Sequence, residues 1–178
     1  MKLPRRHEGT KSNLYKAFFV SSCLRGVFPV LMMVSAACAP TVGKTPDAGS
    51  VMPASIVEPY LQIWDALADD KLDDVKANAG NIANASTALG APAMKISTSA
   101  LSLAGAAGGA EPDIADVRQK FGALSEAIDT YMTGLNLKAP EGVRVAVCPM
   151  VHKPWLQKGD TIANPYYGRE MPTCGNFR

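Results

Sequence analysis

The stretch EPDIADVRQKFGALSEAIDTYMTG, residues 111–134, predicts the fold most clearly. Pro112 just inside its start and Gly134 at its end are typical of a helix. Its apolar residues recur at spacings of three and four and would form a stripe on one face: Ile114, Val117, Phe121, Leu124, Ile128 and Tyr131 or Met132. The charged residues between them mostly face water in this arrangement. We therefore expect an amphipathic helix that packs against other helices.

Three more helices are expected before this stretch. Ser55 and Glu58 have the form of a capping box, which predicts a first helix through Leu67. The helical period then continues over residues 72–89 and, with smaller side chains, over residues 93–110. Because the connections are short, we predict a mainly α fold, an antiparallel four-helix bundle.

The tail after Pro140 differs in kind from the helices. Residues 143–147 alternate as a short strand, and the remainder is dense in Pro, Gly, Asn and aromatic residues. Such a segment is too short to form a core of its own. We therefore predict a C-terminal strand and loop appendage over residues 140–178, closed by two cysteines.

The beginning of the chain is basic and apolar. Six Lys or Arg and one Glu precede Cys38, a balance of +5, so the rest carries −3 within a total of +2. The apolar run over residues 27–39 has the length of a signal-peptide core and is shorter than the roughly 20 residues that span a bilayer. We predict a signal sequence over residues 1–38, a flexible tether over 39–54 and a folded domain over 55–178.

Three outcomes stay open for this leader. It is cleaved after small residues near Ala37 or Ala39, or it receives a lipid at Cys38, because Ser35-Ala-Ala-Cys38 resembles the bacterial lipoprotein box. A third alternative is an uncleaved anchor, which Arg25 and Pro29 disfavour. Each outcome exports the chain, so we expect a periplasmic protein or one anchored to the membrane and facing the periplasm.

Two of the four cysteines, Cys148 and Cys174, fall in the folded part. An even pair in an oxidising compartment favours a disulfide.

Two classes of function find no support in the sequence. The mildly acidic body has no basic stripe with interleaved aromatic residues, which argues against a nucleic-acid partner. There is no phosphate-binding glycine loop and no Gly-x-Ser-x-Gly or His-Glu-x-x-His motif. We expect the protein not to be an enzyme.

Several motifs resemble those of the DUF3347 domain family. They are residues 60–70 (YLQIWDALADD), Phe121-x-x-Leu-Ser-Glu-Ala127, Val147-Cys-Pro-Met150, Trp155 and residues 164–175 (NPYYGREMPTCG). The similarity covers roughly residues 56–178. This family occurs alone in exported proteins and attached to periplasmic adaptor subunits of heavy-metal efflux systems. The resemblance thus implies an envelope location and an association with metal handling.

The matching positions in the tail carry sulfur donors. The resemblance implies Cys148, Met150, Met171 and Cys174 as candidate ligands, and the chemistry of His152 adds an imidazole. Such soft donors suit Cu(I) or Ag(I), with Zn(II) a less favoured choice. If the strand continued through Pro149, residues 148, 150 and 152 would share one face.

The sequence therefore predicts a soft-metal binding protein, with copper or silver first, that acts in metal homeostasis or efflux. The alternative is a structural or interaction module, closed by a Cys148–Cys174 disulfide, that docks on an efflux or envelope complex. The expected partners are a metal ion, an efflux or envelope complex, and the membrane where a lipid is attached at Cys38.

Overall fold

The structure is a computed structural model that describes residues 43–178. The predictions for the leader, for Cys38 and for the first residues of the tether concern residues outside this range. None of the helices in the described range is both long enough and apolar enough to cross a membrane.

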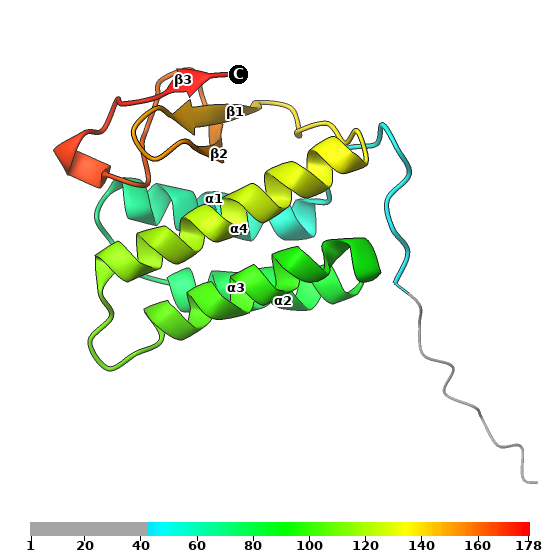
Figure 1. The fold of residues 1–178 in the computed structure, drawn as a ribbon, viewed down its shortest axis with the longest axis horizontal. Helices are drawn as coiled ribbons and strands as arrows, with labels where there is room; N and C mark the ends of the chain where they lie inside the picture. The colour runs from blue at the N-terminus through cyan, green and yellow to red at the C-terminus, as the bar shows by residue number, and fades with distance from the viewer. Residues whose placement is uncertain (1–42) are drawn as a thin grey trace, which may run out of the picture. The chain divides into compact units, whose positions relative to one another are not determined.

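Four helices pack together in the described part of the chain, as the sequence predicts (Figure 1). The first and last of them face each other through Tyr60, which hydrogen-bonds to Ser125 at 2.6 Å, and through Arg118, which donates to the carbonyl oxygen of Leu67 at 3.0 Å. These two contacts run in opposite sequence order, so the two helices are antiparallel. The helices are α1 (Ala54–Ala68), α2 (Val75–Thr87), α3 (Met94–Ala107), which follows the 3-10 turn η1 (Ala91–Ala93), and α4 (Ile114–Gly134).

Helix α4 confirms the stripe that the sequence predicts. Its start is capped by Asp113, whose carboxylate accepts the amide N–H of Ala115 at 2.9 Å. Tyr131 and Met132 are both buried, because the stripe widens where the helix ends. Ile114 is half-buried, and the other members of the stripe are buried: Val117, Phe121, Leu124 and Ile128.

Two helix starts differ from the sequence prediction. Helix α1 begins after Pro53 with no side-chain cap, so the capping box at Ser55 and Glu58 is not formed. Proline suits a position before the first turn because it has no N–H that would need a partner. Helix α2 begins at Val75 instead of Leu72, because Asp74 adopts a left-handed conformation with φ of 58° and interrupts the period.

The tail forms a three-stranded antiparallel sheet in the order β2-β1-β3. The predicted strand is confirmed as β1, and the other two strands were missed. β2 contains Pro154, which cannot donate to a ladder, and it lies at an edge of the sheet. The strands are β1 (Val143–Cys148), β2 (Lys153–Lys158) and β3 (Asn176–Phe177), with a 3-10 turn η2 (Gly168–Glu170) between β2 and β3.

Strand β2 packs on α1 and α4 (Figure 1). Tyr60 carries this junction: its ring stacks on Phe121 with centroids 5.1 Å apart, and its hydroxyl accepts the amide N–H of Leu156 at 3.3 Å. Burial raises the pKa of the Tyr60 hydroxyl far above its ordinary value, so the group stays neutral.

A second junction forms around Arg118. Most charged residues of α4 were predicted to face water, and Arg118 is an exception, since its side chain is 15% exposed. It donates to the carbonyl oxygens of Leu67 and Pro165, each at 3.0 Å, and pairs with Asp70. One guanidinium therefore joins α1, α4 and the tail.

The last residues of the predicted tether belong to the folded domain. Met52 is 1% exposed, and its amide donates to the carbonyl oxygen of Lys138 at 2.9 Å. Lys138 in turn donates to the carbonyl oxygen of Ser50 at 2.9 Å. The domain therefore begins before Ser55, and the described part of the tether is packed against it.

Candidate metal centre

The candidate centre is built around Cys148 and Cys174, which lie close together as free thiols. Cys148 ends strand β1 and is fully buried. Cys174 comes just before β3, which pairs with β1 through Val147 and Asn176, and it is half-buried. The pairing of these strands brings the two cysteines together without a bond between them.

Asn164 holds the two cysteine segments in place. Its side-chain amide donates to the carbonyl oxygen of Cys174 at 2.5 Å and to the sulfur of Cys148 at 3.5 Å. Its side-chain oxygen accepts the amide N–H groups of Tyr166 at 2.8 Å and Tyr167 at 3.3 Å. Asn164 is fully buried, and all its side-chain polar atoms are therefore satisfied.

Sequence reasoning did not single out Asn164 as a site residue. An Asn ahead of Pro165 is typical of a turn in which the side-chain oxygen accepts backbone N–H groups, and that signal was present. The contacts of its amide nitrogen with Cys148 and Cys174 depend on residues 16 and 10 positions away. Only the folded chain reveals them.

Gly175 allows the cysteine segment to approach Trp155. A Cβ at this position would overlap the indole ring of Trp155. Trp155 is 1% exposed, and its Nε1 donates to the side-chain oxygen of the buried Gln157 at 3.0 Å. The fixed indole thus sets where the backbone beside Cys174 can lie.

The environment of Cys174 favours the protonated thiol. Desolvation raises the pKa of Cys174 above its ordinary value, and the neighbouring Cys148 adds to the shift. Binding a metal through both sulfurs would have to release the thiol protons. An N–H directed at the Cys148 sulfur is the kind of contact that stabilises a metal-bound thiolate.

Met150 and His152 lie on a turn and not on a strand. β1 ends at Cys148, and residues 149–152 form the turn that leads into β2. The condition for placing residues 148, 150 and 152 on one face is therefore not met. Met150 is 59% exposed, and His152 is exposed in a left-handed conformation with φ of 55°. Both residues are thus exposed, whereas Cys148 is fully buried.

Met171 lies three residues before Cys174 in the sequence. It follows η2, is half-buried, and its carbonyl oxygen accepts the amide N–H of Cys174 at 3.3 Å. The structure thus brings together Cys148 and Cys174, with Met171 in the adjoining turn. Within residues 43–178, no three side chains of His, Cys, Asp or Glu converge as a metal-binding group.

The chain is a small helical domain with an appended three-stranded sheet, in which Cys148 and Cys174 lie near each other without a bond. Comparisons with models of protein families, with curated proteins and with solved structures find no match to this chain. The resemblance to the DUF3347 family therefore stays a prediction that rests on the motifs quoted above.

Proposed function

We propose that this chain is an exported binding protein that takes Cu(I), or Ag(I) in its place, between Cys148 and Cys174. The observation that carries the proposal is the pair of free thiols brought together by β1 and β3 and joined through Asn164. Two adjacent sulfur donors on separate segments form a ligand pair once both are deprotonated.

The donor set favours a soft monovalent ion. Thiolates and thioethers select Cu(I), whereas structural Zn(II) sites need four ligands in tetrahedral geometry. Met171 adjoins the pair and is the first choice for a third ligand. Met150 and His152, exposed on the neighbouring turn, are proposed to act only in delivering or releasing the ion.

The proposed cellular location and biological role of the chain are inferred from its sequence. The basic, apolar leader and Cys38 favour export with a lipid anchor, and the resemblance to DUF3347 favours metal homeostasis or efflux. Cys174 is half-buried and Cys148 is fully buried, so we propose that an incoming ion meets Cys174 first.

A Cu(I) titration of the reduced full chain, with a chromophoric Cu(I) chelator as competitor, tests the proposal. We expect one Cu(I) per chain, and we expect Cys148→Ser and Cys174→Ser each to weaken binding by more than about a hundredfold, since changes outside the ligand shell alone cost about 10- to 100-fold. Affinity should rise with pH into the alkaline range, because the raised pKa of Cys174 delays loss of its proton.

Met150→Leu is the matched control, because it removes a sulfur outside the pair. We expect it to leave the affinity nearly unchanged. Equal Cu(I) affinity of the wild-type chain and of the Cys148→Ser, Cys174→Ser double variant would exclude the dithiol as the ligand pair.

The second candidate function is a structural module that a Cys148–Cys174 disulfide closes. The same proximity of the two sulfurs favours it, and a bond closing a 27-residue segment would stabilise the domain by about 3 kcal/mol in the chain-entropy model. Counting thiols after denaturation, on protein isolated without reductant, separates the two. Counted against the Cys148→Ser, Cys174→Ser variant, which keeps Cys23 and Cys38, a reversible metal site gives two additional reactive thiols and a permanent disulfide gives none.

A further inference from the structure

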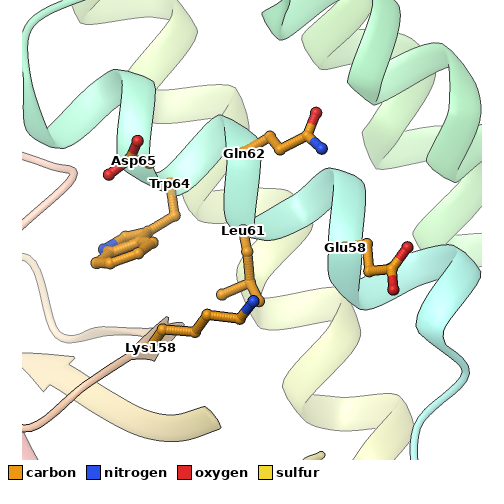
Figure 2. A pocket seen from close by; sticks show the side chains of 6 residues that line it. All are labelled: Glu58, Leu61, Gln62, Trp64, Asp65 and Lys158. Carbon is orange, nitrogen blue, oxygen red and sulfur yellow. The ribbon is translucent and has the colours of Figure 1, made fainter. Parts of the chain in front are cut away.

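A cleft of about 440 Å³ opens beside Trp64, between helix α1 and the end of strand β2 (Figure 2). Its volume falls in the range of about 300–1,000 Å³ that small-molecule sites occupy. None of the sulfur donors of the tail lines it. The lining residues are Glu58, Leu61, Gln62, Trp64, Asp65 and Lys158.

The indole of Trp64 is held at this cleft in one orientation. Its Nε1 donates to the carbonyl oxygen of Ala163 at 2.8 Å, and the side chain stays only half-buried. Figure 2 shows the ring beside Leu61, with the side chain of Lys158 passing below both. A prealigned aromatic ring contacts a ligand at little cost in conformational entropy.

The charged side chains that line the cleft form no ion pairs within the part of the chain that the structure describes. These residues, Glu58, Asp65 and Lys158, are exposed. The carboxylates of Glu58 and Asp65 come from α1, and the ammonium of Lys158 comes from β2. Two carboxylates against one ammonium make the cleft acidic on balance.

We propose that this cleft binds a small organic cation whose alkylated ammonium group lies against Trp64. Trp is the best aromatic partner for such a cation, which is attracted by the electron-rich ring face. Asp65, which also lines the cleft, supplies a countercharge, and Leu61 contacts the alkyl groups. Lys158 weakens binding of a cation, because its ammonium group already places a positive charge in the cleft.

Calorimetric titration of the full chain with choline tests the proposal, with 3,3-dimethyl-1-butanol as a neutral probe of the same shape. We expect saturable binding of choline and none of the neutral probe. Asp65→Asn should weaken choline binding by about 3- to 30-fold, and Lys158→Met should strengthen it by a similar factor. Asp73→Asn, at an exposed acid outside the cleft lining, is the matched control and should leave the affinity unchanged.

Trp64→Leu should abolish binding, but it also removes the hydrogen bond to Ala163. The Asp65 and Lys158 variants alter exposed groups and therefore test the cleft with the fold intact. Absence of a saturable signal with choline, equal binding of the neutral probe, or weaker binding after Lys158→Met would each overturn the proposal.

Discussion

The four helices and the C-terminal tail are held by different kinds of contact. The helices bury a continuous set of aliphatic side chains along their shared faces, such as Ile63, Ile82, Leu103 and Leu124. The tail instead contributes a few large aromatic residues, such as Trp155 and Tyr166, which pack on each other. It also contributes buried hydrogen bonds, such as the one from Asn164 to the carbonyl oxygen of Cys174.

The junction of the two regions mixes both kinds of contact. Tyr166 packs on Trp155 with centroids 5.8 Å apart and on Phe121 of α4 at 6.0 Å, and its hydroxyl donates to the carbonyl oxygen of Pro154 at 2.5 Å. Such aromatic pairs contribute about 0.5–1.5 kcal/mol beyond the area they bury. A segment without a helical period thus becomes part of the core through a small number of strong contacts.

The largest expected effect comes from Trp155→Ala. It empties the space between Gly175 and Tyr166, so we expect a loss of about 3–5 kcal/mol in the free energy of unfolding. Urea unfolding followed by far-UV circular dichroism for the helices, and by reaction of the buried Cys148 thiol for the tail, measures it. Coincident curves at a lowered midpoint would show that tail and helices unfold together.

Phe177→Ala is the control for that variant, because this tail aromatic is only half-buried. We expect it to cost far less than the change at Trp155. If the urea midpoint measured by circular dichroism is unchanged in the Trp155 variant, the helices are stable independently of the tail. That result would contradict the view that tail and helices share one core.

Asn164→Ala is expected to have the next largest effect. It removes a buried amide that satisfies backbone groups of Cys174 and Tyr166, so we expect a loss of about 1–3 kcal/mol in stability. The Cys148 thiol should also react faster with a thiol reagent in the native state, since the tail is released.

Asn84→Ala is the matched control, because Asn84 is exposed on α2. Its stability should differ little from the wild type. Equal thiol reactivity in the Asn164 variant and the wild type would mean that Asn164 does not hold the cysteine segments.

The smallest effect is expected from Asp70→Asn, and it depends on pH. The hydrogen bond from Arg118 holds the pKa of Asp70 below its ordinary value. The pair therefore stabilises the fold above the ordinary pKa of an aspartate, about 3.9, and this contribution is lost as the pH falls through the lowered value.

The difference in stability between the wild type and the Asp70→Asn variant should therefore be present at neutral pH and disappear in acid. Urea midpoints across the acid range measure it, and Asp73→Asn, an exposed acid without an ion pair among the described residues, serves as the control. A difference that stays constant down to low pH would exclude the ion pair as its cause.

The helices could be predicted from the sequence because helical periodicity is a local signal. The stripe from Val117 to Ile128 repeats at three and four residues, and the same spacing selects the buried face in the structure. The exact starts of α1 and α2 were missed, since they depend on Pro53 and on the left-handed Asp74.

The candidate site was predictable only in part. The sequence pointed to Cys148 and Cys174, and the strand pairing that joins them could not be foreseen because β3 has only two residues, Asn176 and Phe177. The condition under which Met150 and His152 would share the face of Cys148 is not met, because a turn at residues 149–152 follows β1 in place of a continued strand. Pairing between distant segments carries no local signature in so short a strand.

The amino-acid sequence by itself determined that four amphipathic helices form and that the sulfur donors concentrate in the tail. The tertiary structure alone decided which of the two cysteine segments' neighbours hold them together, and that Lys158 of β2 lines one cleft with Trp64 of α1. The physical reason is that a helix is specified by neighbours within one turn, whereas a site is specified by the packing of segments far apart in the chain.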